Sequence, residues 1–228
     1  ANCNWERPLY IAISVGEVSK LKFNDYFVQE GLAFRFTPFN YRVWGDAEGD
    51  NGYAVDIKKL YDNVMNRYKY GGLDTPGLYL DETTLRTCYY HRRLFAQLAK
   101  ELIKQGDHVR ARKVLTYAEQ AVPAYNVPEI YESGSFDIAT AYAALGEKTK
   151  AVTLFNHLIA ESEDYINWAF SLGNGRTGMM QNDCLYKFWQ WNAYNERMKE
   201  IDKESYEASN RRFEEKYALF TQIINNRN

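Results

Sequence analysis

The sequence predicts a mainly α-helical protein, built of helical hairpins in a right-handed superhelix and preceded by a small extended or β segment. Three observations predict this fold class. Apolar and alternating stretches stand near the N-terminus, helix caps and stops recur from residue 55 onward, and a pattern of small residues returns later in the chain. We therefore expect two regions, an extended linker at 1–54 and a helical domain at 55–228.

Two stretches near the N-terminus predict strands. One runs from Leu9 to Val15. The other is LAFRFTPF, where large apolar side chains hold every second position from Leu32 to Phe36 and Pro38 ends the pattern. Between them, FNDYFVQEG predicts a short helical turn that Gly31 closes. The following WGDAEGDNGY is rich in Gly and Asp and predicts a loop. Because the chain starts without Met and almost at once on a strand, we expect it to be a piece of a larger protein.

Two helices are expected next, at VDIKKLYDNVMNRYKYGG and at LDETTLRTCYYHRRLFAQLAKELIKQG. Asp56 is placed to cap the first helix, and Val55 and Leu60 hold the two positions of a hydrophobic staple. The same arrangement recurs in the second helix, with Asp81 as the cap and Gly106 as the stop.

A repeat of helical hairpins follows. The pairs Gly106-Asp107 and Gly146-Glu147 mark two turns, 146 − 106 = 40 positions apart. Small residues hold matching places before and after each turn: Ala99 and Ala139 before, Ala111 and Ala151 after. Small side chains let the two helices of a hairpin approach closely. The pattern resembles the tetratricopeptide repeat, whose usual period is about 34 residues; here the linker AYNVPEI lengthens it.

The last third of the chain is expected to be helical and is rich in aromatic residues. Trp189 and Trp191 stand two positions apart, so they point in different directions from one helix. One interpretation is a helix packed on two sides. The other is an exposed aromatic shelf for a sugar or a peptide. A final helix with an aromatic stripe from Tyr206 to Phe220 is expected to cover the end of the superhelix.

Composition and charge exclude some classes of partner. The chain has 228 residues, 46% hydrophobic and 25% charged, which is ordinary for a globular protein with a sizeable core. Its net charge of −2 gives no electrostatic reason to expect nucleic acid as a partner. No apolar run approaches the roughly 20 residues of a membrane-spanning helix. We therefore expect no direct membrane insertion of this segment.

The sequence shows no catalytic, metal or cofactor site. Cys3, Cys88 and Cys184 are far apart, without ligand spacing to a His, and we expect buried thiols. GNGRTG at 173–178 has the spacing of a dinucleotide fingerprint, which has meaning only after a strand. Because YINWAFSL predicts a helix, we interpret GNGRTG as a loop between helices. No Ser or Cys has an evident base nearby, so we expect this fragment not to be an enzyme.

The hairpins also predict where a ligand would bind. In a tetratricopeptide array the first helix of each hairpin lines a concave groove. The positions of Ala99 and Ala139 indicate which side of each first helix faces the groove, and the aromatic helix extends that surface. The expected groove residues are Arg93, Lys100, Phe136, Thr140, Trp189 and Trp191. A charged and aromatic groove suits an extended peptide. The alternative is that the terminal helices fill the groove.

The segments NWERPLYIA and YGGLDTPGLYLDE resemble the C-terminal region of large bacterial multi-span membrane proteins related to protein O-mannosyltransferases. The resemblance covers most of the chain and is strongest from Asn4 to Gly106. In that family an N-terminal membrane half resembles the GT-C class of glycosyltransferases, which use lipid-linked sugar donors, and a soluble tail with tetratricopeptide-like helices follows. The resemblance implies that this chain is such a tail, on the extracytoplasmic (periplasmic) side and tethered through an N-terminal membrane region. It also implies that the catalytic acid lies in the membrane half.

Two functions are compatible with this resemblance. In the first, the tail packs against its own membrane domain and holds acceptor protein or glycan near the active site of a glycosyltransferase. In the second, the tail is a protein-interaction scaffold of a membrane protein with no glycosyltransferase activity.

Overall fold

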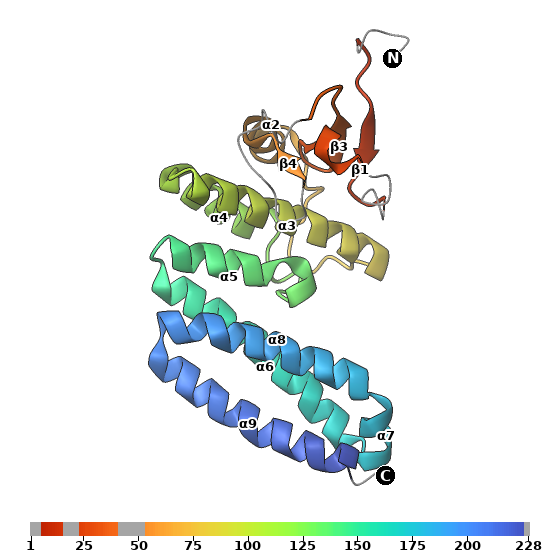
Figure 1. The fold of residues 1–228 in the computed structure, drawn as a ribbon, viewed down its shortest axis with the longest axis vertical. Coiled ribbons are helices and arrows are strands. Elements are labelled where there is room, and N and C mark those ends of the chain that lie inside the picture. Colours follow the sequence, from red (N-terminus) through yellow and green to blue (C-terminus); the bar gives the residue numbers. More distant parts are fainter. Residues whose placement is uncertain (1–5, 16–22, 41–52, 226–228) are drawn as a thin grey trace. The chain divides into compact units, whose positions relative to one another are not determined.

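A computed structural model describes residues 6–15, 23–40 and 53–225 of the chain. The chain divides into two compact units, Ala1–Pro128 and Glu129–Asn228. The first unit holds a small sheet and several helices, and the described part of the second unit is helical (Figure 1). The fold is therefore mainly α with an N-terminal β segment, which confirms the predicted fold class.

A small sheet opens the first unit. Its described strands lie in the order β1-β3-β2-β4. Their bounds are Tyr10–Ala12 for β1, Phe27–Gln29 for β2, Ala33–Phe36 for β3 and Ala54–Val55 for β4. Strands β1 and β2 pair antiparallel with β3, and β4 pairs parallel with β2. Phe27, Phe34 and Tyr53 form the core of this sheet. Both predicted strands are present, although each is shorter than the sequence indicates.

The stretch FNDYFVQEG differs from its prediction. Only Asn24–Tyr26 form a helical turn, the 3₁₀ element η2, and the next three residues are strand β2. Phe27 and Val28 are buried, and β2 pairs on both sides, with β3 and with β4. Pairing with strands that follow later in the chain therefore overrides the local helical pattern. The loop predicted at WGDAEGDNGY lies outside the described residues except for Tyr53.

Helix α2, Ile57–Asp62, follows the sheet and continues into a π-helical turn, η3, Asn63–Arg67. Asp56 caps α2 as predicted, since its carboxylate accepts a hydrogen bond from the Lys59 amide. The predicted helix extends to Gly71, whereas the observed one ends at Arg67 because Tyr68 has extended backbone.

The predicted boundary between residues 54 and 55 would divide strand β4. Val55 pairs with Gln29 in the sheet, and the Asp56 amide donates a hydrogen bond of 3.0 Å to the Gln29 carbonyl. The structure instead divides the chain at Pro128, within the linker between the two hairpins.

Two helical hairpins carry the predicted repeat. The bounds are Glu82–Lys104 for α3, His108–Ala121 for α4, Ser135–Ala144 for α5 and Lys148–Ser171 for α6. Gly106 and Gly146 have φ of 76° and 77°, the left-handed region that glycine adopts at helix ends. In each turn the amide after the glycine donates a 2.9 Å hydrogen bond to the preceding helix, and the four repeat alanines are fully buried. The repeat in the sequence is thus a repeat of hairpins; their superhelical stacking stays a prediction.

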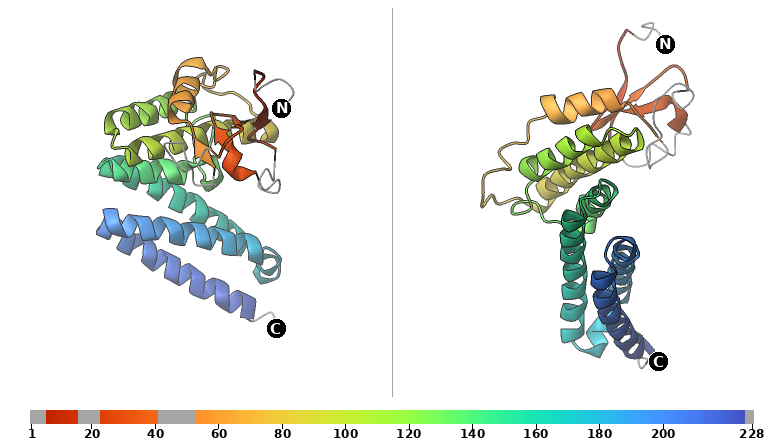
Figure 2. Two further views of the ribbon diagram at one scale, coloured as in Figure 1. Left: turned by 45° about the horizontal axis from the view of Figure 1, so that its top comes forward. Right: turned by 90° about the vertical axis from the view of Figure 1, so that its left-hand side faces the viewer.

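The second unit contains a short 3₁₀ turn, the α5–α6 hairpin and the C-terminal helices. The bounds are Tyr131–Ser133 for η4, Asn174–Met179 for α7, Gln181–Ile201 for α8 and Lys203–Asn225 for α9. Helix α8 packs against α6 and α9, which lie beside it in Figure 2. The stripe predicted on α9 is present, since Phe213, Tyr217 and Phe220 pack around Phe188 of α8.

The GNGRTG stretch is the short helix α7 rather than a loop. The buried Thr177 hydroxyl donates to the Ala169 carbonyl of α6 at 2.7 Å, which holds α7 on the end of that helix. Because α6 precedes the motif, it lacks the strand that a dinucleotide site requires. Cys88 and Cys184 are free, buried thiols as predicted, and Cys3 lies outside the described residues.

Candidate functional site

Two of the predicted groove residues belong to the first unit. Arg93 is exposed on α3, with its guanidinium carbon 4.9 Å from the ring centre of Tyr90. Lys100 is half-buried on the same helix. The other predicted groove residues all belong to the second unit.

In the second unit the structure brings Phe136 and Trp189 to the same place. Both rings contact Tyr131, with ring centres 5.7 Å and 5.3 Å from it. Thr140 is half-buried, and its hydroxyl donates to the Phe136 carbonyl of its own helix. Trp191 differs, because it is fully buried and its indole N–H donates to the Ser209 hydroxyl at 2.8 Å. Trp191 is therefore a core side chain and lines no surface.

Three aromatic side chains, Tyr131, Tyr186 and Trp189, form what we call the aromatic shelf. Tyr186 and Trp189 are 43% and 52% exposed, and their rings stack at 5.7 Å with 13° between the planes. The same helix buries Phe188, Trp191 and Tyr194. The helix thus packs in the core through some aromatic side chains and exposes others; that the exposed rings bind a sugar or a peptide stays a prediction.

Polar groups lie at the shelf. The Gln190 side-chain amide donates a 3.0 Å hydrogen bond to the Glu132 carboxylate, next to Tyr131 in the chain. Gln190 is fully buried, and within the described residues its Oε1 has no hydrogen-bond partner. The shelf therefore combines apolar ring faces with the Glu132 carboxylate, whereas the Gln190 amide that bonds to this carboxylate is buried.

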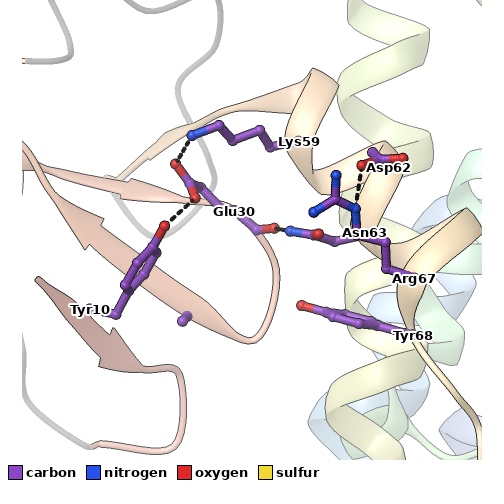
Figure 3. Close-up of a pocket in the computed structure, with 8 residues that line it drawn as sticks. Tyr10, Glu30, Lys59, Asp62, Asn63, Arg67 and Tyr68 are labelled. Carbon is purple, nitrogen blue, oxygen red and sulfur yellow. Dashed lines mark hydrogen bonds and ion pairs between the residues drawn. The ribbon is translucent and has the colours of Figure 1, made fainter. Parts of the chain in front are cut away.

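The first unit contains a pocket that the sequence analysis does not predict (Figure 3). Its volume is about 350 Å³. The pocket is lined by Tyr10, Glu30, Ala33, Lys59, Asp62, Asn63, Arg67 and Tyr68. We call it the sheet–helix pocket, because these residues come from β1 and β3, the end of β2, α2 and η3.

Glu30 lies at the centre of the polar network of this pocket. Its side chain is 8% exposed, and its carboxylate accepts hydrogen bonds from Lys59 at 2.7 Å, from Tyr10 at 3.1 Å and from Arg35. Burial raises the pKa of Glu30, but the hydrogen bonds and positive charges of Lys59 and Arg35 outweigh burial and hold it below its ordinary value. Glu30 is therefore ionised at neutral pH.

Tyr68 and Asn63 join the helical turn to the sheet. The Tyr68 hydroxyl accepts a hydrogen bond of 2.9 Å from the Leu32 amide, and the Asn63 side chain donates to the Glu30 carbonyl at 2.6 Å. The hydroxyl of Tyr68 lies where a Cβ on Gly31 would be, at 2.0 Å. Arg67 pairs with Asp62 at 2.6 Å on the helical side of the pocket.

Within 6–15, 23–40 and 53–225, no group of three His, Cys, Asp or Glu side chains is placed to hold a metal ion. Among the helices of the same residues, none has both the length and the apolar character needed to span a bilayer.

Comparison with known proteins gives one match. A family model, described as TMEM260-associated domain 2, matches residues 1–57. This segment includes the four described strands and ends at the first residue of α2. No curated protein and no solved structure matches the chain. Residues 1–57 are therefore similar to a domain that is tied to TMEM260.

Proposed function

We propose that this chain is a non-catalytic, extracytoplasmic segment of a membrane protein resembling GT-C protein O-mannosyltransferases, and that it positions an acceptor protein or glycan. The similarity of residues 1–57 to a TMEM260-associated domain is consistent with a segment of a membrane protein of this kind. The resemblance of NWERPLYIA and YGGLDTPGLYLDE to the tails of such proteins supports the same link.

The binding role rests on the aromatic shelf. Large aromatic faces that stay exposed beside the Glu132 carboxylate suit a ligand with both apolar and polar edges. Oligosaccharides and extended peptides both have this character. Two groove residues predicted from the sequence, Phe136 and Trp189, meet at the shelf residue Tyr131, which adds support.

Titration of the purified chain with unfolded acceptor peptides and with oligosaccharides tests this role. Truncation of an aromatic anchor typically costs 2 kcal/mol or more, so we expect Trp189→Ala to weaken binding about thirtyfold. Trp168→Ala is the matched control, because Trp168 is 50% exposed and lies edge-to-face against Tyr165 of its own helix, α6. Full affinity in Trp189→Ala, or an equal loss in both variants, would contradict the assignment.

The alternative function is a protein-interaction scaffold whose parent has no glycosyltransferase activity. The exposed Arg93 beside Tyr90 favours it, because this pair suits acidic or carbonyl groups of a protein partner. Comparing glycoproteins with and without the parent gene separates the two functions. A loss of specific glycans without the gene supports the first, and an unchanged set supports the second.

A further inference from the structure

We propose that the sheet–helix pocket binds one neutral sugar ring, as a site distinct from the aromatic shelf. The proposal rests on four properties of the pocket: its size, its balanced charges, its mixture of hydrogen-bond donors and acceptors, and its two tyrosine rings. It does not depend on the shelf, since the two features belong to different units of the chain.

The size of the pocket fits a single small molecule. Ligand pockets in proteins commonly span about 300–1,000 Å³. The sheet–helix pocket, at about 350 Å³, lies at the lower end of this range. One sugar ring or a molecule of similar size is therefore a suitable occupant, whereas a nucleotide or a longer peptide is not.

The charges of the pocket favour a neutral ligand. Each charged side chain in its lining is already paired, Glu30 with Lys59 and Asp62 with Arg67. An anion would have to compete with these two carboxylates for Lys59 and Arg67. A cation would have to compete with the two basic side chains for the same carboxylates. The Glu30 side chain is only 8% exposed, so drawing Lys59 away from it would leave a buried charge uncompensated, which is costly. The Asp62–Arg67 pair is more exposed and contributes less to this preference. A neutral ligand leaves both pairs intact.

The lining offers donors and acceptors together. Carboxylates can accept several hydrogen bonds, and a guanidinium or an ammonium has N–H groups beyond the one used in its ion pair. The Tyr68 hydroxyl accepts from the Leu32 amide, which leaves its own hydrogen to donate. A sugar hydroxyl both donates and accepts, so it can bond to either kind of group. This mixture therefore suits a polyhydroxylated ring better than a ligand with only donors or only acceptors.

Tyrosine rings supply the apolar part of the lining. Tyr10 lies on β1 on one side of Glu30, and Tyr68 lies on the other side, after η3 (Figure 3). The C–H face of a sugar ring packs well on an aromatic ring, and hydrogen bonds with Glu30 and with the Leu32 amide hold the hydroxyls of the two tyrosines in place.

The polar groups are held in place before any ligand arrives. Three hydrogen bonds fix the Glu30 carboxylate, and the hydrogen bonds of Tyr68 and Asn63 fix the turn that carries Arg67. These side chains are already ordered in the folded chain, so less conformational entropy is lost when a ligand binds.

Amide shifts in ¹⁵N spectra of the full chain test the proposal. The probes are methyl glycosides of glucose, galactose and mannose, with inorganic phosphate and ethylammonium as charged counterparts. We expect at least one glycoside to shift the amides of Leu32, Asn63 and Tyr68 in a saturable way, with a Kd on the order of 1 mM. We expect phosphate and ethylammonium to leave these amides unchanged.

Two variants with matched controls locate the site. Arg67→Ala removes an exposed wall of the pocket and should weaken binding about tenfold, which corresponds to about 1.4 kcal/mol. Arg86→Ala, which breaks a similar exposed pair with Glu82 on α3, should leave binding unchanged. Tyr10→Ala should likewise weaken binding, and Tyr79→Ala, at a highly exposed tyrosine, should not. Urea unfolding of each variant confirms that it is folded.

Several outcomes would overturn the proposal. These are the absence of glycoside shifts at the pocket, competition by phosphate, or equal losses in Arg67→Ala and Arg86→Ala. Shifts confined to Tyr186 and Trp189 would also overturn it, while supporting the shelf. The two proposals thus fail independently, because their readouts lie on different residues.

Discussion

At the scale of single residues, Gly31 and Tyr68 determine how the helical turn meets the sheet. Gly31 has φ of +146°, and a Cβ there would lie 2.0 Å from the Tyr68 hydroxyl. We expect Gly31→Ala to displace Tyr68, to break its hydrogen bond with the Leu32 amide and to destabilise the chain by about 1–3 kcal/mol. Urea midpoints measure this effect.

Gly77→Ala is the matched control for this prediction. Gly77 also has positive φ, 81°, but nothing lies within 4 Å of the position of its Cβ. Gly77→Ala therefore incurs only the cost of an unfavourable backbone conformation. We expect it to lower the free energy of unfolding less than Gly31→Ala does. Equal losses in the two variants would show that Tyr68 does not restrict Gly31.

Glu30 gives a second prediction at this scale. Its folded-state pKa lies below the ordinary value of about 4.3, so the ionised carboxylate stabilises the fold above that pH. This contribution is lost as the pH falls through the lowered pKa. We expect the urea midpoint to decrease more between pH 6 and pH 3 in the unmodified chain than in Glu30→Gln. Glu82→Gln, at an exposed helix pair, should follow the unmodified chain. If the urea midpoint decreases equally with pH in the unmodified chain and in Glu30→Gln, this account is contradicted.

At the scale of elements, the hairpins depend on close helix approach. Ala99 and Ala139 are fully buried where their helices pack. We expect Ala99→Leu and Ala139→Leu each to overpack a hairpin and to cost about 1–3 kcal/mol. Ala218→Leu, at an exposed position of α9, serves as the control and should change stability little. Denaturation midpoints that match the unmodified chain in both buried variants would contradict this hairpin register.

Local signals in the sequence predicted the helices well. The predicted caps Asp56 and Asp81 each accept a hydrogen bond from an amide of the first helical turn, because capping depends only on neighbouring residues. Strand β2 could not be predicted this way, since its partners lie elsewhere in the chain. Helix α7 was also missed, because a hydrogen bond from Thr177 to another helix holds it.

At the scale of the whole molecule, the two candidate sites were predictable to different degrees. The shelf comes largely from one helix, so the sequence indicated an aromatic surface there, although periodicity did not separate the exposed Trp189 from the buried Trp191. The sheet–helix pocket draws on several separate segments from Tyr10 to Tyr68. Only the folded chain brings these side chains together, so no local pattern marks the pocket.

The parallel pairing of β2 with β4 has a consequence for the order of folding. The α3–α4 and α5–α6 hairpins join neighbouring stretches of chain through short turns, which close quickly. Strand β4 must instead return across a long intervening segment to lie beside β2, with Val28 opposite Ala54. Loop closure of this kind is slow, so we expect the hairpin amides to become protected early in refolding and the β2–β4 amides late. The sheet–helix pocket, which needs both the sheet and α2, would then be among the last features to form.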